Sequence, residues 1–271
     1  MVADYVACHF GKYHLKARAG CCPSPFLELC CGKARATERG AWEPVASSRF
    51  TEVSRFKWEE RPYYYKRYLQ RGWLEVVKAW VFGSRAGRAW RGALLLEENA
   101  LRTPEVVLAG WRGAECFAVT RAVVGGVRLG QYVRQLKTQI DRRAQRAVWS
   151  VAEELGRTVG RMHKCGIVHG DLRWGNILVE GTPENIQFVL LDNERTRRYR
   201  HVPRREILKN LVQLNMIPSL GLSRTERMRF WRAYRAENSA LPGAHKQWVR
   251  RVIACTTRRL ARRAKKKRSV P

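Results

Sequence analysis

The hydrophobic pattern divides the chain into a strand-rich part followed by a helix-rich part. Short β-prone runs at 42–46, 52–58 and 63–69 are separated by polar links, Ser47-Ser48-Arg49 and Glu59-Glu60-Arg61-Pro62, and predict three strands in an antiparallel meander. A helix is expected over 85–99, before Thr103-Pro104, and two further strands over 106–109 and 116–120. Residues 1–40 show no sustained periodicity, so we expect them to form an irregular extension.

Beyond Gly125-Gly126 the pattern becomes helical. Apolar residues at spacings of three and four predict one long helix over 143–165, with a stripe of Val148, Val151, Leu155, Val159 and Met162. Two short strands, 177–179 and 188–191, flank a Gly181-Thr182-Pro183 turn, and 204–263 is typical of amphipathic helices. The pattern predicts an α+β protein in four parts: an irregular extension (1–40), a β-rich part (41–123), an α-rich part (124–255) and a basic tail (256–271).

Composition narrows the class of protein. Of the 271 residues, 45% are hydrophobic, which excludes a disordered chain. Lysine and arginine number 53 against 23 acidic residues, and the resulting net charge of +30 favours anionic partners such as nucleic acid, acidic lipid or a phosphorylated sugar. No apolar run reaches the roughly 18 residues of a membrane span. Polar residues interrupt the start of the chain, where a signal peptide would be apolar, so we expect a cytoplasmic location.

The cysteines carry less information. Two adjacent pairs, Cys21-Cys22 and Cys30-Cys31, lie near the start of the chain. Their spacing does not follow the C-x2-C pattern of zinc sites. Reduced thiols are therefore expected there, with a metal site as the alternative.

Aspartate is scarce, and two of the four aspartates lie in distinctive segments. His169-Gly170-Asp171-Leu172-Arg173-Trp174-Gly175-Asn176 follows the H-x-D-x-x-x-x-N catalytic-loop pattern of kinases. In that pattern Asp171 accepts the proton of an attacking hydroxyl, and Asn176 offers its amide oxygen to a metal ion. Asp192 follows an apolar strand, where kinases keep a second metal ligand. The alternative interpretation is an ordinary loop between a helix and a strand.

The β-rich part supplies candidate nucleotide-binding residues. Lys66 lies on the third predicted strand, where kinases hold the lysine that pairs with the α- and β-phosphates; the alternative is a surface lysine. Ser47 and Ser48 lie between the first two strands, where a glycine-rich loop would cover the phosphates, although this loop has no glycine. Arg121 and Val123 belong to the segment before Gly125-Gly126, where backbone groups would contact adenine; a plain linker is the alternative.

With these residues in place, the chain resembles the lipopolysaccharide kinases of the Kdo/WaaP type, which are bacterial members of the protein-kinase-like fold. The resemblance covers roughly residues 45–235. It rests on the catalytic-loop segment and Leu191-Asp192, and on three further stretches: Tyr64-Tyr65-Lys66-Arg67-Tyr68, Ser84-Arg85-Ala86-Gly87-Arg88-Ala89-Trp90-Arg91 with Arg102-Thr103-Pro104, and Leu222-Ser223-Arg224-Thr225-Glu226-Arg227 with Arg229-Phe230. It implies a protein-kinase-like bilobal fold, with a small antiparallel β N-lobe that binds nucleotide and a mainly α-helical catalytic C-lobe.

The resemblance also implies an activity: ATP- and Mg2+-dependent transfer of phosphate to a sugar hydroxyl, of heptose or Kdo, in the lipopolysaccharide inner core. Asp171 and His169 would be catalytic, Asn176 and Asp192 would bind the metal, and Lys66 would bind phosphate. Because that acceptor is anionic and membrane-anchored, we expect a peripheral enzyme at the cytoplasmic face of the inner membrane. The chain departs from the kinase pattern in two places. Asn193-Glu194 stands in place of Phe-Gly, and Lys66 has no clear glutamate partner, because the candidates Glu97 and Glu98 lie near the end of the predicted helix, where a solvated pair is the alternative.

Two other functions are compatible with the sequence. One is a kinase of another small molecule or of a protein. The other is an inactive basic pseudokinase or binding protein, although nucleic acid is not the expected partner because the aromatic residues are scattered and no nucleic-acid-binding motif is present. The run from Arg258 to Arg268 holds eight basic residues and no acid, and is expected to bind an anionic membrane surface; a solubilising tail is the alternative.

Overall fold

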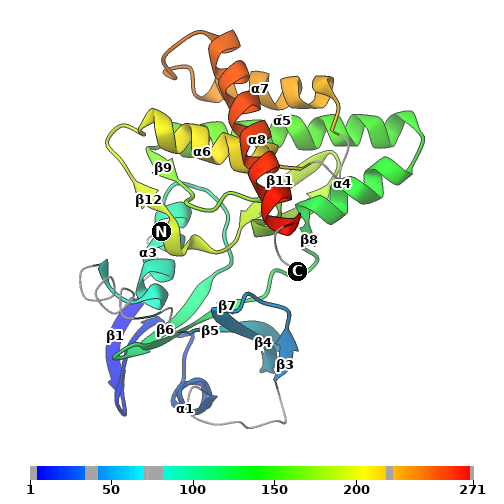
Figure 1. Ribbon diagram of the computed structural model, residues 1–271. Coiled ribbons are helices and arrows are strands. Elements are labelled where there is room, and N and C mark those ends of the chain that lie inside the picture. The colour runs from blue at the N-terminus through cyan, green and yellow to red at the C-terminus, as the bar shows by residue number, and fades with distance from the viewer. Residues whose placement is uncertain (1–4, 34–41, 70–71, 73–81, 218–221, 269–271) are drawn as a thin grey trace. The chain divides into compact units, whose positions relative to one another are not determined.

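A computed structural model describes residues 5–33, 42–69, 72, 82–217 and 222–268. The chain divides into two units (Figure 1). The N-terminal unit comprises Met1–Glu98, Thr103–Val124 and Asp192–Arg195, and the C-terminal unit comprises Asn99–Arg102, Gly125–Leu191 and Thr196–Pro271. The N-terminal unit thus includes a short segment from much later in the sequence, Asp192–Arg195.

The N-terminal unit is built on a seven-stranded sheet. Its strands pair antiparallel throughout, in the order β1-β2-β6-β7-β5-β4-β3. The predicted meander is confirmed as β3, β4 and β5, since β4 pairs with both of its neighbours in sequence. The strands are β1 (Tyr5–Phe10), β2 (Tyr13–Arg18), β3 (Glu43–Val45), β4 (Thr51–Trp58), β5 (Arg61–Tyr68), β6 (Val106–Arg112) and β7 (Glu115–Arg121).

The expected irregular extension over 1–40 is wrong for residues 5–33. These residues form β1, β2 and the helix α1 (Ser24–Lys33), and β2 pairs with β6. The physical reason is visible in β2, where Tyr13, Leu15 and Ala17 are buried and alternate with polar residues, as a half-buried strand requires. The alternation spans only six residues, which hid it among the cysteines and basic residues around it.

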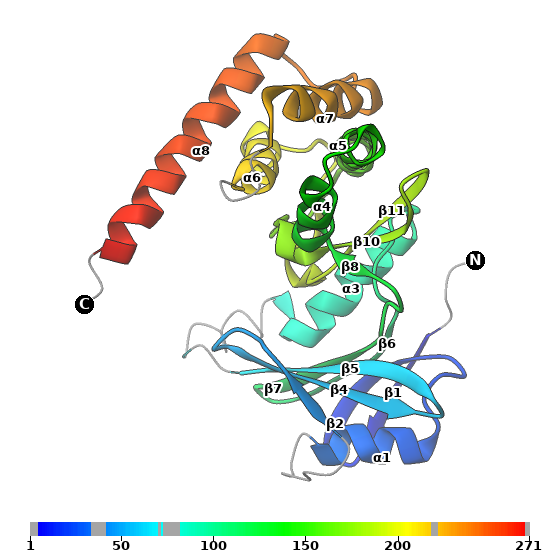
Figure 2. The ribbon, with the colours of Figure 1, turned by 90° about the vertical axis from the view of Figure 1, so that its right-hand side faces the viewer.

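Both faces of the sheet carry a helix (Figure 2). On one face α1 packs, with Phe26 among the aromatic rings of Phe56 and Tyr63. On the other face lies α3 (Arg85–Glu97), whose Trp90 belongs to a second apolar cluster. Strand β7 serves both clusters by alternation: Phe117 and Val119 join the first, and Cys116 and Ala118 join the second.

The C-terminal unit is mainly helical. Helix α5 (Arg142–Lys164) confirms the helix predicted over 143–165, to within one residue at each end. It carries the expected apolar stripe on its buried side. The helices are α4 (Leu129–Thr138), α5 (Arg142–Lys164), α6 (Arg204–Asn215), α7 (Arg224–Glu237) and α8 (His245–Arg268). Short strands complete the unit: β8 (Val127–Arg128), β10 (Ile177–Thr182) and β11 (Asn185–Leu190) in one sheet, and β9 (Ile167–Val168) with β12 (Arg197–Arg198) in another.

Close packing joins α5 to α7. A Cβ atom at Gly156 would lie 2.3 Å from the backbone oxygen of Phe230, and one at Gly160 would lie 2.7 Å from that of Tyr234. The two glycines are four residues apart and therefore lie on one face of α5. This face places α7 against α5 at backbone contact, and so fixes Tyr234 beside the C-terminal end of α5.

Helix α8 changes the interpretation of the basic tail. The segment 256–268 does not form a separate part, because it continues the helix that begins at His245. Trp248 and Thr256 are buried, whereas the charged residues from Arg258 to Lys265 are mostly exposed, so the helix is anchored by its first half. Figure 2 shows its second half extending past α6 and α7. Among the described residues, no helix has the length and apolar character needed to cross a bilayer.

The core of the C-terminal unit also contains a buried histidine, His163 of α5. Its ring nitrogens contact the Tyr234 hydroxyl at 2.9 Å and Asn210 Oδ1 at 3.1 Å. Burial lowers the pKa of His163 from 6.5 to about 4, because a charged ring would lose its hydration. The folded protein therefore keeps this ring neutral at pH 7.

This burial predicts a loss of stability in mild acid. As the pH falls, the unfolded chain takes up a proton on His163 near pH 6.5, whereas the folded protein takes it up only near pH 4. The contribution to stability is complete above pH 6.5, and about 3 kcal/mol is lost as the pH drops toward 4. Urea unfolding of wild type and His163→Gln between pH 7.5 and 4.5 measures it. Equal pH dependence in the two proteins would contradict the prediction.

Candidate active site

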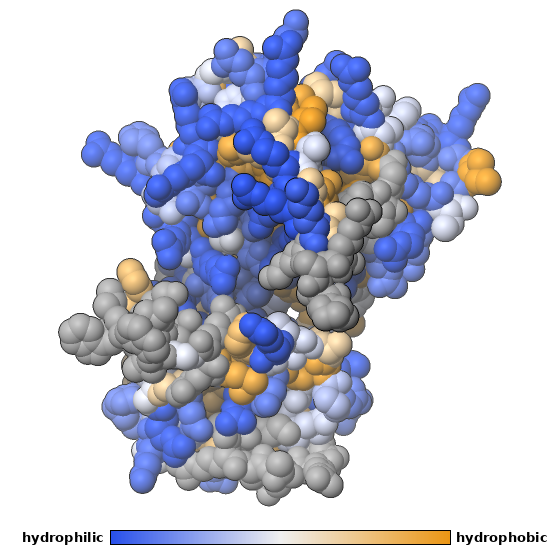
Figure 3. All heavy atoms as spheres, in the orientation of Figure 1, coloured by the Kyte–Doolittle hydropathy of each residue, from blue (hydrophilic) through white to orange (hydrophobic). Residues whose placement is uncertain are grey.

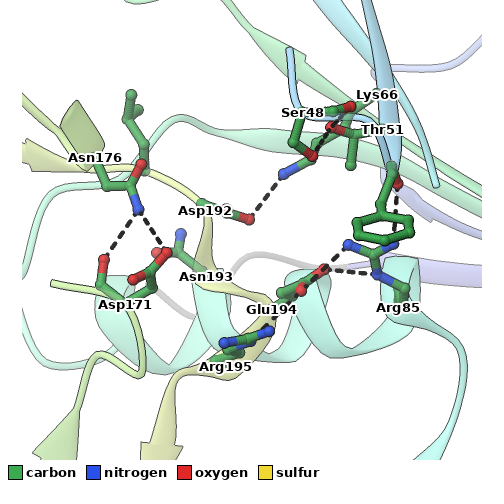
Figure 4. Close-up of polar contacts among 12 residues, drawn as sticks. Ser48, Thr51, Lys66, Arg85, Asp171, Asn176, Asp192, Asn193, Glu194 and Arg195 are labelled. Atoms are coloured by element: carbon green, nitrogen blue, oxygen red, sulfur yellow. Dashed lines mark hydrogen bonds and ion pairs between the residues drawn. The ribbon is translucent and has the colours of Figure 1, made fainter. Parts of the chain in front are cut away.

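In the N-terminal unit the structure brings Lys66 and Asp192 together. Lys66 lies on β5 and its Nζ is 2.8 Å from Asp192 Oδ1 (Figure 4). The side chains are 25% and 35% exposed, so both polar groups remain accessible to a ligand. Asp192 adopts a left-handed backbone conformation, with φ of 61°, which turns the chain as it leaves β11. The two residues are 126 positions apart in sequence, and their pairing places a cation beside a carboxylate on the sheet.

Directly beyond Asp192, a buried ion pair fixes the same segment to α3. Arg85, near the start of α3, donates from Nε to Glu194 Oε2 at 3.0 Å and from Nη2 to Glu194 Oε1 at 3.3 Å (Figure 4). The side chains are only 5% and 8% exposed. Arg85 Nη1 also donates to the backbone oxygens of Phe50 and Leu69, at 3.1 and 3.4 Å. One guanidinium therefore holds the segment after Asp192 and the ends of two strands.

Asn193, between these two acidic residues, fits against α3 as well. Its Nδ2 donates to Thr103 Oγ1 at 2.5 Å. A Cβ atom at Gly92 would lie 2.2 Å from the backbone oxygen of Asn193. Only glycine at position 92 therefore allows α3 to approach the Asn193 backbone this closely. The residues that replace the Phe-Gly of the kinase pattern thus form a short helix, η2 (Asn193–Arg195), packed on α3.

The acid expected to pair with Lys66 is not found in α3. Within the described part of that helix the only acidic residue is Glu97, and its Oε2 binds Arg18 at 2.7 Å. Glu98 caps the helix end and is exposed. Lys66 has Asp192 as its acidic neighbour instead.

The remaining predicted nucleotide residues also lie in the N-terminal unit. Ser47 and Ser48 form the turn between β3 and β4, where the Ser47 hydroxyl donates to Thr51 O at 2.6 Å and the Ser48 hydroxyl lies 2.9 Å from Thr51 Oγ1. Both hydroxyls therefore already stabilise the turn. Arg121 ends β7, where its backbone amide donates to Glu105 O at 2.9 Å, and Val123 follows two residues later.

In the C-terminal unit the structure brings Asp171, Asn176 and His169 together in the loop between β9 and β10. Asp171 Oδ1 accepts hydrogen bonds from Arg173 Nε at 2.6 Å and from Gln213 Nε2 at 3.2 Å. Its Oδ2 accepts from Arg173 Nη2. The same atom accepts from Asn176 Nδ2 at 3.3 Å, a contact drawn in Figure 4. The Arg173 side chain is 54% exposed and that of Asp171 only 14%. The carboxylate is thus held by protein donors behind and covered by one exposed guanidinium.

Asn176 is oriented by the same loop. Its Nδ2 donates to the backbone oxygen of Asp171 at 2.9 Å as well as to the carboxylate. Its own backbone oxygen accepts from Leu191 N at 2.8 Å. Because the nitrogen of the amide faces Asp171, the Oδ1 atom points away and is the group that could bind a cation.

His169 is fully buried and serves the interior of the protein. Its Nε2 lies 2.9 Å from the backbone oxygen of Leu191, which can only accept, so Nε2 carries the proton. Nδ1 then accepts from Asp171 N at 3.4 Å. The sequence placed His169 with Asp171 among the catalytic residues; this burial instead indicates a residue that positions Leu191 and, through the chain, the start of the Asp192 segment.

Sequence reasoning missed four residues of the site. Arg173 lies inside the motif, two residues after Asp171, but the motif gives this position no role. Gln213 lies 42 positions from Asp171, on α6, and nothing in a helical pattern marks it. Arg85 and Glu194 are separated by 109 positions, and no local pattern links them.

The side chains of Asp192, Asn176 and Lys66 are of the types that bind Mg2+ and phosphate in kinases. Asp192 offers a carboxylate and Asn176 an amide oxygen, and oxygen donors of this kind are those that Mg2+ prefers. Lys66 offers an ammonium group to phosphate. Each unit thus carries one oxygen ligand of the predicted pair, together with the residues that orient it.

An antiparallel sheet bearing a lysine–aspartate pair, and a helical unit bearing the His-Gly-Asp loop with its asparagine, define the class of protein-kinase-like phosphotransferases. The profile of the lipopolysaccharide kinase (Kdo/WaaP) family matches residues 36–234, and the chain belongs to this family. It is therefore a kinase.

Solved structures agree on the fold. A structure of WaaP in complex with acyl carrier protein is 21% identical in sequence, with a TM-score of 0.65, over 89% of this chain and 97% of that one. An aminoglycoside-3'-phosphotransferase of type VIII is 17% identical, with a TM-score of 0.52, over 81% of this chain and 96% of that one. A search of curated proteins gave no significant match. The likeness supports the predicted kinase-like α+β fold.

Proposed function

We propose that this kinase uses ATP and Mg2+ to phosphorylate a sugar hydroxyl, of heptose or Kdo, in the inner core of lipopolysaccharide. The observation that carries the proposal is the family match over residues 36–234. The chemistry of the site supports it, since a general-base carboxylate, two oxygen ligands and a phosphate-binding lysine are the groups that phosphoryl transfer requires. A net charge of +30 suits an acceptor that is itself rich in phosphate and carboxylate.

In this mechanism Asp171 takes the proton of the sugar hydroxyl. The O–H bond breaks, a bond forms between the sugar oxygen and the γ-phosphorus, and the bond to the ADP oxygen breaks. Arg173 must first leave the Asp171 carboxylate so that the hydroxyl can approach, and its exposed position permits this movement. Gln213 and Asn176 keep their hold on the carboxylate meanwhile.

Residues of the N-terminal unit would bind the nucleotide. Lys66 exchanges its contact with Asp192 for the α- and β-phosphates, which frees the Asp192 carboxylate. Asp192 and Asn176 would hold Mg2+, which neutralises charge on the phosphates when bound. Ser47 and Ser48 shape the turn that covers the phosphates, and Val123, with Arg121 before it, meets the adenine through its backbone.

The metal assignment predicts unequal effects of two substitutions. Asp192→Ala removes an anionic ligand and should abolish the Mg2+-dependent part of ATP binding, whereas Asn176→Ala removes a neutral ligand and should weaken it less. Calorimetric titration of ATP at several Mg2+ concentrations measures both. Lys66→Met is the control, because it also breaks the pair with Asp192 but should weaken ATP binding at every Mg2+ concentration alike. An unchanged Mg2+ dependence in Asp192→Ala would remove Asp192 from the metal site.

The location of the acceptor suggests a peripheral association with the cytoplasmic face of the inner membrane. Helix α8 is the element suited to it, because its second half carries basic residues without any acid. Figure 3 shows hydrophilic residues crowding the face that bears α8. Trp231 and Trp248 are buried, so they take no part in membrane contact.

Neutralising the exposed end of α8 should weaken membrane binding. Each basic residue near anionic lipid contributes about 1 kcal/mol, so the triple variant Arg258→Gln, Arg262→Gln, Lys265→Gln should bind anionic vesicles at least tenfold more weakly at low salt. Turnover of a soluble acceptor should stay unchanged. The matched control, Arg142→Gln, Arg143→Gln, Arg146→Gln, removes three exposed charges from the start of α5. Equal loss in both variants would show that net charge alone attracts the protein to lipid.

The acceptor itself is tested with purified protein. Core oligosaccharide from lipopolysaccharide, with ATP and Mg2+, should yield a phosphorylated sugar detectable by mass spectrometry, and aminoglycosides or a generic protein substrate should not. Phosphorylation of the generic acceptors alone would favour a kinase of another small molecule or of a protein. ATP binding without transfer to any acceptor would favour an inactive relative.

A further inference from the structure

A chain of hydrogen bonds between buried polar side chains connects the C-terminal end of α7 to Asp171. It begins at Asn238, the residue that ends α7, and passes through Tyr234, His163 and Asn210 to Gln213. All five residues are buried. Buried polar groups are costly unless they are hydrogen-bonded, and a fully bonded network specifies one arrangement.

The orientation of each amide follows from a neighbour whose role is fixed. Leu172 N, a backbone donor, contacts Gln213 Oε1 at 3.2 Å, so the Gln213 Nε2 is the atom that faces Asp171. The His169 backbone oxygen can only accept, and it lies 2.8 Å from Asn210 Nδ2, so Asn210 presents its oxygen to His163. Asn210 Nδ2 also donates to Gln213 Oε1 at 3.2 Å.

The histidine tautomer follows from these amides. Because Asn210 Oδ1 is an acceptor, His163 Nε2 must carry a proton. The neutral ring then accepts at Nδ1 from the Tyr234 hydroxyl, and the hydroxyl oxygen accepts in turn from Asn238 Nδ2 at 3.0 Å. Every link donates in one direction, from Asn238 toward the carboxylate of Asp171. The low pKa of His163 agrees with a neutral ring.

Helix α6 is the part of this network that touches the catalytic loop. Asn210 and Gln213 are one turn apart and reach the His169 oxygen, the Leu172 amide and the Asp171 carboxylate. A fourth contact comes from Trp174, whose Nε1 donates to the Leu214 oxygen at 2.9 Å. The loop is therefore aligned on a helix, and helices hold side chains more rigidly than loops do.

We propose that Gln213 is a positioning residue for the general base, which holds Asp171 Oδ1 in place and is itself held by the line of hydrogen bonds from Asn238 through His163. This inference rests on the proposed role of Asp171. Arg173 also binds Asp171, but it is exposed and must withdraw for the acceptor to enter. Gln213 is the buried donor that remains on that oxygen atom when Arg173 withdraws.

The kinetic test uses Gln213→Met, which keeps the length of the side chain and removes its hydrogen bonds. With core oligosaccharide and Mg-ATP, kcat should fall by roughly 10- to 100-fold, the size expected for a misplaced base, while KM for Mg-ATP stays within about twofold. The matched control is Thr256→Val, which removes a buried hydroxyl bonded to Asn215 in the same unit and leaves this network intact. That variant should lose comparable stability and keep its kcat.

A spectroscopic measurement checks the hydrogen-bond network without any assay of activity. Nitrogen-15 NMR of labelled histidine should show His163 neutral, with the proton on Nε2, and His163→Gln identifies its signal. In Gln213→Met the His163 signal should shift, because Asn210 loses a partner. A proton on Nδ1, or no response to Gln213→Met, would overturn the network.

Comparison with Asp171→Asn separates the two proposals. If Asp171→Asn is inactive while Gln213→Met keeps the kcat of wild type, Asp171 remains the base and the positioning role of Gln213 is wrong. If Thr256→Val lowers kcat as much as Gln213→Met does, the loss follows from reduced stability and Gln213 is structural only. If Asp171→Asn is fully active, the proposed base is wrong and the role of Gln213 falls with it.

Discussion

Replacing Asp171 with asparagine should lower kcat by roughly 100- to 10,000-fold, the loss typical of removing a general base. Asparagine keeps the shape of the side chain but cannot accept the proton of the sugar hydroxyl. It also turns an NH2 group toward the donors that surround this position, Arg173, Gln213 and Asn176. KM for Mg-ATP should change little, because Lys66 and Asp192 are unaltered.

The control is the same chemical change at another aspartate. Asp141 is the N-cap of α5 and accepts from Ala144 N at 2.6 Å, and asparagine caps helices about as well as aspartate does. Asp141→Asn should therefore match wild type in stability and rate. Urea unfolding of both variants shows whether a loss of rate reflects chemistry or folding. A folded Asp171→Asn protein with normal turnover would exclude Asp171 from the reaction.

Removing one partner of the Arg85–Glu194 pair should have the largest effect on stability. Arg85→Met removes the buried countercharge of Glu194 and leaves only the exposed Arg195, 3.8 Å away, beside the carboxylate. Breaking a buried pair in this way costs about 3–5 kcal/mol. The substitution also releases the backbone oxygens of Phe50 and Leu69. Urea unfolding measures the loss. Because Glu194 is two residues from Asp192, the variant should also need more Mg2+ for half-maximal ATP binding.

Two further variants define the origin of this effect. Arg85→Met combined with Glu194→Leu removes both charges, and should recover a large part of the lost stability because no unpaired carboxylate remains. Arg55→Met breaks an exposed pair with Glu43 at 3.8 Å, in which the side chains are 46% and 77% exposed, and should cost less than about 1 kcal/mol. If the double variant is as unstable as Arg85→Met, the carboxylate is not the cause.

The elements predicted best are those with a long or repeated pattern. The 23-residue helix α5 has an apolar residue every three or four positions, so its bounds are found within a residue or two. The meander β3–β5 is marked at each end by polar turns. In contrast β1 and β2 have six residues each, and a short strand is specified by its partner in the sheet as much as by its own pattern.

The site divides in the same way. Asp171 and Asn176 lie within one motif, so their local relation follows from spacing alone. The analogy with kinases indicates Lys66 and Asp192 as separate site residues but not their direct pairing across 126 positions. The contacts of Gln213 with Asp171 and of Arg85 with Glu194 have no analogy to suggest them. Such contacts depend on which helix face the packing of the core turns inward, and no local pattern encodes that.

The N-terminal hairpin has a consequence for work with shortened chains. The family match begins at residue 36, and a chain cut there would lack β1, β2 and α1. Strand β6 would then become an edge strand with unpaired N–H and C=O groups, next to an uncovered apolar face that includes Tyr65 and Phe117. Exposed edges of this kind recruit strands from other molecules. A protein trimmed to its recognisable kinase region should therefore aggregate, even with every catalytic residue in place.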